Sequence, residues 1–391
     1  MRFPEFTEEW KAEQLDNIAT LSKGIGISKE QLSEDGEPCI LYGELYTKYK
    51  SEIIKQVESK TDINGSKLKR SKANDVIIPC SGETAVDIAT ARCVPFDNIL
   101  FGGDLNVISL HQYDGAFMSY QLNGKRKYDI ARVAQGVSIV HLYGEHLKAI
   151  KTYNPTLPEQ QKIAKLLSLL DDRIDTQNKI IEDLKKLKSA IIEKTFNENY
   201  SNKIRLRDVG SYIRGLTYSS DDVVESNGIF VMRSNNIING SSLDYHNNIV
   251  SVNKQILTEQ QLQTGDIVIC MANGSSSLVG KSSFYDGDCS TPITVGAFCG
   301  IYRSKEPIVK WLFQTNKYRR YIWNSLQGGN GAIANLNGDD ILRMSFSIPA
   351  TPAKDNRIKL LTSVDTLLES NISLCDLYIS QKLYLLRQMF I

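Results

Sequence analysis

Three runs of the sequence bring several Lys and Arg side chains together, and two of them interleave these cations with Tyr. The runs are SKLKRSK from Ser66 to Lys72, GKRKYDIAR from Gly124 to Arg132, and KYRRYIW from Lys317 to Trp323. Clustered cations bind phosphates well, because each neutralised phosphate releases counterions, and this release supplies most of the sequence-independent affinity for nucleic acid. Any single run fits an ordinary solvated charged face at least as well.

Two loops carry side chains that could read DNA bases. Tyr42 to Glu44 and Arg233 to Asn236 each follow a predicted strand and differ in chemistry. In the major groove Arg pairs with guanine, Asn or Gln pairs with adenine, and a carboxylate accepts from the cytosine amino group. An ordinary polar turn explains these loops equally well. The predicted DNA-binding candidates are Lys23, Tyr42, Glu44, Lys125, Arg126, Lys127, Arg132, Arg214, Arg233, Asn235, Asn236, Arg319 and Arg320, with Lys23 and Arg214 better suited to phosphate than to base.

The sequence predicts no catalytic, cofactor-binding or metal-binding residues. A DNA methyltransferase needs a glycine-rich cofactor loop and an N-P-P-Y or D-P-P-Y tetrapeptide, and the nearest match, NPTL at Asn154, lacks both the second proline and the aromatic residue. There is no G-x-x-x-x-G-K-[ST] phosphate loop. His141, Glu145 and His146 do not have the H-E-x-x-H spacing of a zinc site, so they are better explained as ordinary polar side chains facing solvent. These patterns favour a binding protein over an enzyme.

Composition narrows the class of protein further. A chain of 391 residues predicts two folded units. The net charge is only +1, so a polyanionic partner requires positive charge that is concentrated locally. The seven cysteines are odd in number and scattered, which predicts reduced thiols rather than disulfides. No apolar run is long enough for a membrane span, and the start, MRFPEFTEEWKAEQ, is not a secretion signal, so we expect a cytoplasmic protein with no membrane partner.

The two halves of the chain repeat each other. LDNIATLSKGIGIS aligns without a gap with LRDVGSYIRGLTYS, bringing Gly24 onto Gly215 at an offset of 191. The same offset pairs Ile40 to Tyr46 with Val231 to Ile237. Further along the offset becomes 194, which pairs Pro158 with Pro352 and Asp171 with Asp365. Matched glycines, prolines and apolar positions over two long segments indicate a duplication, and the alternative is a chance alignment.

Each half contains a mixed unit followed by one helix. Short β-branched and aromatic runs, such as DVIIPC, NVISL, VSIVHL, DIVICM and AFCGIYR, are separated by turn residues and predict strands. A helical piece is expected over Lys310 to Leu326. The predicted fold class is therefore α+β, with two tandem mixed α/β domains joined by two long helices in a pseudo-twofold internal repeat. The predicted boundaries are residues 1–150 for the first domain, 151–200 for the central helix, 201–345 for the second domain and 346–391 for the C-terminal helix.

The repeated helix has a clear start and a narrow apolar seam. Pro158 suits a first turn, and Thr156 with Glu159 has the spacing of a capping box. The seam then alternates steps of four and three residues through Ile163, Leu167, Leu170, Ile174, Gln177, Ile181, Leu184, Lys188 and Ile191, as in a coiled coil. Adding 194 gives a second seam that is polar at the same two interior positions, Asn371 and Lys382.

Antiparallel, symmetric pairing of the two helices would bring Gln177 and Asn371 together. A buried amide pair satisfies its hydrogen bonds in one register only, so these two residues are the predicted register pair. About 38 residues at ~1.5 Å each would make a rod of ~57 Å that could hold two domains at a fixed spacing. The alternative is that each helix packs on its own domain as ordinary core.

Several stretches together resemble the specificity subunit of a type I restriction-modification system. They are RFPEFTEEW at the start, the box PTLPEQQKIAKLLSLLDDRI after the first domain, the looser box IPATPAKDNRIKLLTSVDTLL after the second, and the approach QGGNGAIANL. The similarity covers essentially the full length. The second box departs from the pattern, because Ala353, Lys354 and Asp355 stand where the first has Glu159, Gln160 and Gln161.

The resemblance implies two target-recognition domains that each read one half of a bipartite double-stranded DNA site, separated by two helices in an antiparallel coiled coil. It further implies two modification (adenine methyltransferase) subunits and restriction (motor-nuclease) subunits as partners. The chain itself would be non-catalytic and hold no cofactor, while S-adenosylmethionine, ATP and Mg would bind in the partner subunits. Two alternatives stay open from the residues: a coiled-coil scaffold for protein partners without direct DNA readout, and a stand-alone enzyme with duplicated domains.

Overall fold

The computed structural model describes residues 2–197, 200–326 and 334–390. The contacts within the chain divide it into two units. Unit 1 comprises Met1–Lys179 with Asn371–Ile391, and unit 2 comprises Ile180–Ser370. This division falls inside the two long helices, so the domain boundaries expected at residues 150, 200 and 345 stay a prediction. Gln327 and most of the QGGNGAIANL stretch lie outside the described residues.

Unit 1 is built on two four-stranded sheets, in the orders β2-β10-β6-β8 and β4-β3-β9-β5. Two short ladders, β1-β12 and β11-β7, complete it. Its strands are β1 (Lys11–Gln14), β2 (Ala19–Lys23), β3 (Glu37–Ile40), β4 (Lys60–Thr61), β5 (Lys69–Arg70), β6 (Asp75–Pro79), β7 (Ser81–Gly82), β8 (Arg92–Val94), β9 (Leu100–Phe101), β10 (Leu105–Leu110), β11 (Val140–His141) and β12 (Lys151–Asn154). Its short helices are α1 (Leu15–Ile18), α2 (Glu44–Thr47), α3 (Ala85–Ile88), α4 (Gly115–Asn123), α5 (Lys127–Val133) and α6 (Gly144–Lys148).

Unit 2 repeats the first sheet, in the order β14-β22-β18-β20, and the two ladders, β13-β24 and β19-β23, but its second sheet, β15-β17-β16-β21, adds the fourth strand beside β17 rather than beside β21, the equivalent of β9. Its strands are β13 (Lys203–Arg205), β14 (Gly210–Arg214), β15 (Val223–Val224), β16 (Ile229–Met232), β17 (Val250–Val252), β18 (Ile267–Cys270), β19 (Ala272–Asn273), β20 (Ser282–Phe284), β21 (Ile293–Val295), β22 (Cys299–Ser304), β23 (Ala334–Asn335) and β24 (Ser345–Ser347). Its short helices are α8 (Leu206–Val209), α9 (Val309–Leu312), α10 (Asn316–Leu326) and α11 (Gly338–Leu342).

The predicted mixed α+β architecture is confirmed, and the quoted β-rich runs fall on β6, β10, β11, β18 and β22. One expectation needs a correction: the helical piece expected over Lys310 to Leu326 is two helices, α9 and α10. The hydroxyl of Thr315 accepts a hydrogen bond from the backbone N–H of Tyr318 at 3.0 Å. Thr315 therefore caps the start of α10, which explains why the helix restarts there.

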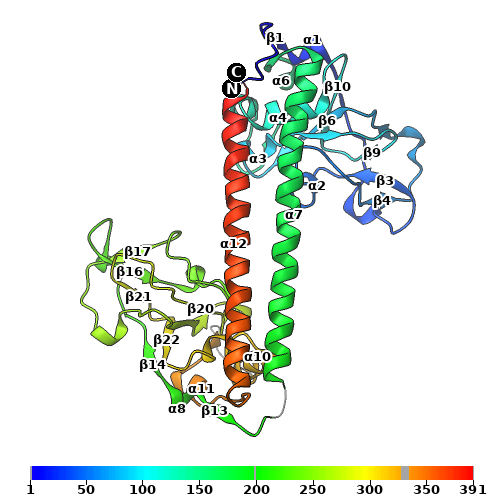
Figure 1. The fold of residues 1–391 in the computed structure, drawn as a ribbon. Coiled ribbons are helices and arrows are strands. Elements are labelled where there is room, and N and C mark those ends of the chain that lie inside the picture. Colours follow the sequence, from blue (N-terminus) through cyan, green and yellow to red (C-terminus); the bar gives the residue numbers. More distant parts are fainter. Residues whose placement is uncertain (1, 198–199, 327–333, 391) are drawn as a thin grey trace. The chain divides into compact units, whose positions relative to one another are not determined.

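The structure contains two long helices, α7 (Leu157–Phe196) and α12 (Ala353–Gln388) (Figure 1). Inside unit 1, seam residues near the start of α7 share one buried cluster with Leu385 near the end of α12 and with Phe117 and Tyr120 of the domain. Inside unit 2, Ile192 of α7 and Leu361 of α12 lie in the domain core. The predicted antiparallel pairing is confirmed, and each paired segment also packs on its own domain.

The alignment between the halves is wrong by one residue at β3 and β16. The carbonyl of Ile40 accepts from the N–H of Gly102, and in unit 2 the carbonyl of Met232 accepts from the N–H of Gly296. The structural partner of Ile40 is therefore Met232 and not Val231. It follows that Leu41 corresponds to Arg233 and Glu44 to Asn236.

Candidate nucleic-acid interface

Each unit carries a groove at an equivalent place in the repeat. In unit 1 a groove of about 1070 Å³ is bounded by the loop after β3 and by β7, and in unit 2 a groove of about 520 Å³ is bounded by the loop after β16 and by β19. Both loops are the ones that the sequence singled out for base reading. The structure thus places Tyr42, Arg233 and Asn235 on the lining of these grooves, whereas Glu44 and Asn236 do not line them.

A buried polar side chain anchors each of these loops. The Glu44 carboxylate accepts from the N–H of Leu41 at 2.9 Å, from Lys48 at 2.8 Å and from the Ser59 hydroxyl. The Asn236 side-chain oxygen accepts from the N–H of Arg233 at 2.9 Å.

Both anchors are inaccessible from the groove, because Glu44 is 6% exposed and Asn236 is fully buried. The Asn236 amide nitrogen donates to the carbonyls of Asp244 and Asn247. These two predicted DNA-binding residues hold the loop in shape, and neither is part of the interface proposed below.

The groove-facing residues of the two loops differ in chemistry. Unit 1 exposes Tyr42, and the hydroxyl of Tyr46 donates to the carbonyl of Ser81 at 3.1 Å. Unit 2 exposes Arg233 and Asn235. The two grooves therefore offer different hydrogen-bonding groups, as two different half-sites would require.

The basic residues around α5 divide into available and occupied side chains. Lys125 and Arg132 are exposed, and Arg132 is 3.4 Å from Asp129. Arg126 is more enclosed, because its guanidinium lies 3.3 Å from Asp129 and 5.2 Å from the centre of the Tyr153 ring. Burial, together with the positive charge of Arg92, lowers the pKa of Lys127. Lys125 and Arg132 are the better phosphate candidates of these four.

The basic run on α10 presents its cations outward. Arg319 and Arg320 are exposed, and Trp323 on the same helix is 63% exposed. Lys317 instead lies over the Phe346 ring at 5.6 Å. In the basic run from Ser66 to Lys72, the guanidinium of Arg70 is bound to the carboxylate of Glu37 at 2.6 and 3.0 Å, so its charge is already compensated.

Lys23 and Arg214 end strands β2 and β14, and both are exposed. A glycine follows each of these two residues, and the backbone contacts of this glycine explain why both halves of the chain keep it. A Cβ on Gly24 would lie 2.0 Å from the carbonyl oxygen of Gly102, and a Cβ on Gly215 would lie 2.2 Å from that of Gly296. Only glycine fits this close backbone approach, so both cations leave the sheet at equivalent points.

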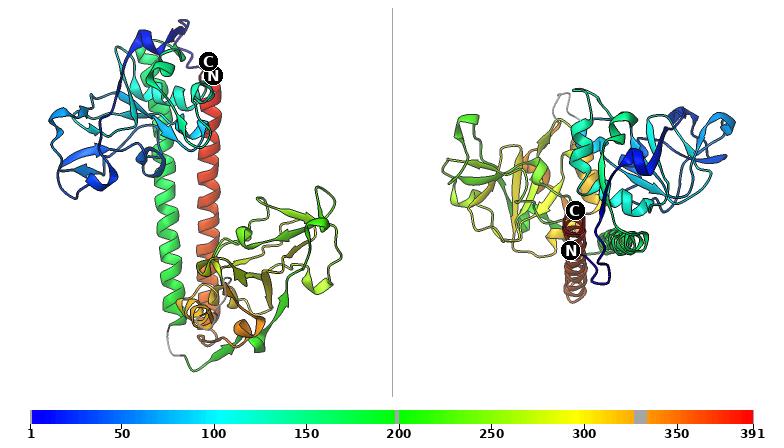
Figure 2. Two further views of the ribbon diagram at one scale, coloured as in Figure 1. Left: turned by 180° about the vertical axis from the view of Figure 1, so that it is seen from behind. Right: turned by 90° about the horizontal axis from the view of Figure 1, so that it is seen from above.

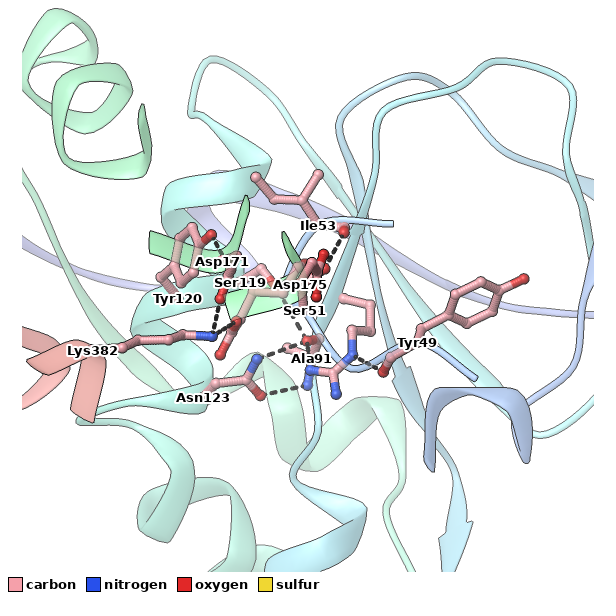
Figure 3. Close-up of polar contacts among 12 residues, drawn as sticks. Tyr49, Ser51, Ile53, Ala91, Ser119, Tyr120, Asn123, Asp171, Asp175 and Lys382 are labelled. Carbon is pink, nitrogen blue, oxygen red and sulfur yellow. Dashed lines mark hydrogen bonds and ion pairs between the residues drawn. The ribbon is translucent and has the colours of Figure 1, made fainter. Parts of the chain in front are cut away.

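Sequence reasoning missed the ion pairs at the polar seam positions. In unit 1, Lys382 of α12 lies 2.6 Å from Asp171 of α7 and 2.5 Å from Glu52. Figure 3 shows Lys382 and the Tyr120 hydroxyl approaching the same Asp171 carboxylate.

Unit 2 repeats this arrangement. Lys188 of α7 lies 2.7 Å from Asp365 of α12, whose carboxylate also binds Lys310 and the indole N–H of Trp311. The matched polar positions in the two seams were a signal for these pairs, but their acidic partners could not be read from periodicity alone.

The predicted register pair is in contact within unit 1. The side-chain amide of Gln177 donates to the Asn371 side-chain oxygen and, at 3.2 Å, to the Asn371 backbone carbonyl. Both residues are largely enclosed, and Gln177 is 6% exposed. This is the contact that symmetric antiparallel pairing of the seams requires.

The N-terminal segment docks on the start of α7 and beside the end of α12 (Figure 2). Arg2 binds the fully buried Glu159 carboxylate through two nitrogens, each at 2.7 Å. Trp10 packs edge-on against Phe117 and Phe390 at ring distances of 5.8 and 6.4 Å. Glu159, predicted as a capping-box residue, therefore anchors the N-terminal segment.

Gln160 of the same box is also buried. Its side-chain oxygen accepts from the N–H of Asp114 at 2.9 Å, and its nitrogen donates to the carbonyl of Pro155 at 2.8 Å. Two of the most distinctive residues of the box thus serve contacts inside unit 1.

Among the described residues, no group of three or more His, Cys, Asp or Glu side chains is placed to hold a metal ion. All seven cysteines are free thiols, and six of them are buried. Burial raises the pKa of the Cys39 and Cys80 thiols to about 11. No helix in the described parts of the chain is long and apolar enough to cross a membrane.

Comparison with known proteins agrees with this geometry. Residues 7–186 match the family described as type I restriction modification DNA specificity domain. The chain is 34% identical over 173 residues to the EcoKI specificity subunit of Escherichia coli K12 and, over the same length, to the StySPI specificity subunit of Salmonella potsdam. Each match covers 41% of this chain and 34% of the relative, so the chain spans about a third of the length of these curated relatives.

Solved structures extend the likeness to the whole fold. The crystal structure of a type I restriction-modification S subunit from M. genitalium superposes with a TM-score of 0.62 at 15% identity, covering 100% of this chain and 97% of that one. A chain from a study of complex assembly in the type I R-M system gives a TM-score of 0.54 at 13% identity, covering 98% and 97%. Residues 7–186 of this chain match the family model of the type I restriction modification DNA specificity domain, and the fold of the whole chain is similar to that of the M. genitalium S subunit.

Proposed function

We propose that this chain is the DNA specificity subunit of a type I restriction-modification system, with each unit reading one half of a bipartite double-stranded site. The observation that carries the proposal is the pair of equivalent grooves whose scaffolds match and whose exposed side chains differ. A duplicated scaffold lets both units approach DNA in the same way, while different groups on the loops select different bases. Exposed cations at Lys23, Lys125, Arg132, Arg214, Arg319 and Arg320 would supply the phosphate contacts.

The proposed partners are two modification (adenine methyltransferase) subunits and the restriction subunits. The long helices carry many exposed apolar side chains, which suits docking of other proteins. On α12 these are Leu360, Leu367, Ile372, Leu374, Leu377, Ile379, Leu383 and Tyr384, and on α7 they include Leu169, Ile180 and Leu187.

Of the three divergent positions at the start of the second box, only one, Gln161 with Asp355 in its place, is exposed in the first box. Glu159 and Gln160 are buried inside unit 1, so their replacement by Ala353 and Lys354 changes internal contacts rather than an exposed docking surface. Lys354 in turn lies 3.1 Å from Glu306.

In this proposal the chain performs no chemistry itself. S-adenosylmethionine, ATP and Mg would bind in the partner subunits, and the assembled complex would work in the cytoplasm. The exposed apolar helix faces also suit the second candidate, a scaffold for protein partners without DNA readout.

Mobility-shift binding to random-sequence duplexes, with and without the co-expressed adenine methyltransferase partner, separates the two functions. A specificity subunit retards DNA in the presence of its partner, and the retardation weakens as salt rises because counterion release drives it. A scaffold leaves the duplex unshifted in both samples, which would contradict the proposal.

A further inference from the structure

Resting on the proposed function, we infer that Arg233 and Asn235 determine specificity for the half-site of unit 2, where Arg233 reads a guanine and Asn235 reads an adenine in a nearby base pair. The half-site of unit 1 is read by other groups, because the corresponding loop exposes Tyr42 and carries no arginine.

Arg233 is an exposed arginine with most of its hydrogen-bonding capacity unused. Its side chain donates one hydrogen bond, from Nη2 to the carbonyl of Asn248 at 3.3 Å, and no carboxylate in the described parts of the chain forms an ion pair with it. A guanidinium carries five N–H donors in a planar fork that matches guanine O6 and N7. This single weak hydrogen bond orients the Arg233 guanidinium and leaves its other N–H donors available to a base.

The groove arginine of unit 1 offers a direct contrast. Arg92 also lines its groove, but it is only 9% exposed, and its nitrogens donate to the carbonyls of Tyr49 and Ala91, both at 3.0 Å. Two of its three nitrogens are therefore committed to the backbone of its own unit, and its side chain is nearly buried. Arg233 is not committed in this way.

Asn235 stands two residues further along the same loop and is exposed. Among the described residues its side-chain amide has no hydrogen-bond partner, so both its oxygen and its nitrogen are available. An asparagine amide matches the N7 acceptor and the N6 donor of adenine. Phe298, on the lining of the same groove, is 66% exposed and offers an apolar surface beside these polar groups.

The loop is held in one shape before any ligand binds. The buried Asn236 amide fixes the backbone N–H of Arg233, and the amide of Asn273 on β19 donates to the Ser234 hydroxyl at 3.2 Å. A preformed loop loses little conformational entropy on binding, which suits a base-reading element better than a solvated turn.

The test uses the complete chain co-expressed with its adenine methyltransferase partner, followed by genome-wide mapping of methylated adenines. Wild-type protein should give one bipartite motif. Arg233→Ala should relax one guanine position in one half of that motif by about 5-fold to 150-fold and leave the other half unchanged. Asn235→Ala should relax an adenine position in the same half.

Arg343→Ala is the matched control, because Arg343 is an exposed arginine of unit 2 outside the groove lining. It should leave the motif intact. An unaltered motif in Arg233→Ala, or methylation that falls equally at all sequences while the variant remains folded by thermal unfolding, would overturn the inference. Failure of the proposed function looks different, because the wild-type complex would then give no bipartite motif at all.

Discussion

Each unit contains a buried ion pair between α7 and α12, at an equivalent position of the repeat. Lys382 and Lys188 occupy matching seam positions, and each meets an aspartate of the opposite helix. Their surroundings nevertheless differ. Burial alone would lower the pKa of Lys382, but Glu52 and Asp171 outweigh it and the pKa is raised. Burial dominates at Lys188, where Asp365 compensates less because Lys310 shares it, and the pKa is lowered.

Replacing Lys382 with Ala should destabilise unit 1 strongly. Asp171 and Glu52 would remain buried without a cation, and removing one partner of a buried pair costs about 3–5 kcal/mol in the free energy of unfolding. Lys148→Ala, which removes an exposed pair with Glu145 in the same unit, should change the free energy of unfolding little, because solvent screens an exposed pair. Urea unfolding of both variants measures the difference, and equal costs would contradict a structural role for the buried pair.

Asp365 should make stability depend on pH at acid values. Burial raises the pKa of its carboxyl, but attraction to Lys188 and Lys310 outweighs burial and the pKa ends below the usual value. Because the carboxyl pKa is lower in the folded state, the ionised Asp365 stabilises the fold at pH values above the unfolded pKa of about 4. This stabilisation is lost as the pH falls through the folded pKa. The difference in unfolding free energy between wild type and Asp365→Asn should therefore shrink between pH 5 and pH 3, and a constant or growing difference would contradict this assignment.

Among the elements, the two long helices could be predicted well from the sequence. The roles of residues in the loops between short strands could be predicted less well. Periodicity, the Pro158 start and the matched polar exceptions predicted the helices and their antiparallel seam, because a seam of this length leaves few other packings. The loop residues Arg233 and Asn235 were predicted as base-reading candidates and they line a groove, but Glu44 and Asn236 are buried anchors. Residue type alone cannot separate an anchor from a reader, because both are polar side chains that follow a strand.

The one-residue error between β3 and β16 has a similar cause. Identity between the halves is low, and neighbouring apolar residues such as Val231 and Met232 fit the same strand position equally well. Pairing with β9 and β21 determines the register, and such pairing joins residues far apart in the sequence. The N-terminal anchor between Arg2 and Glu159 was missed for the same reason, because its partners are separated by most of unit 1.

The amide pair in the seam should behave as a register device. Asn371→Leu removes the side-chain oxygen that accepts from Gln177 and leaves the enclosed amide partly unsatisfied, with only its 3.2 Å bond to the backbone carbonyl of residue 371, which should cost about 1–3 kcal/mol in unfolding free energy. Adding Gln177→Leu removes the unsatisfied group and should recover most of that loss. A double-mutant cycle by urea unfolding checks this, and a double variant less stable than Asn371→Leu alone would show that the amides do not act as a pair.

Across the whole molecule, two related units present different chemistry on one repeated scaffold while the net charge stays near zero. Nucleic-acid affinity must then come from a few local cations rather than from a general positive field. The exposed pair Arg319 and Arg320 on α10 is one such source.

Replacing both arginines with Ala should weaken binding of the partner complex by a similar factor on every duplex. It should also reduce the slope of log affinity against log salt by up to about 2, since each lost phosphate contact removes about 0.9. Titrations of two unrelated duplexes at several salt concentrations measure both effects. Loss confined to one sequence would instead assign these residues to base reading.

In the proposed function, one chain reads two separate half-sites through its two units. Mapping of methylated adenines in cells that carry the chain with its methyltransferase partner tests it most directly. We expect a motif of two specified parts separated by a gap of fixed length and unspecified sequence. A single continuous motif, or methylation without sequence preference, would contradict it.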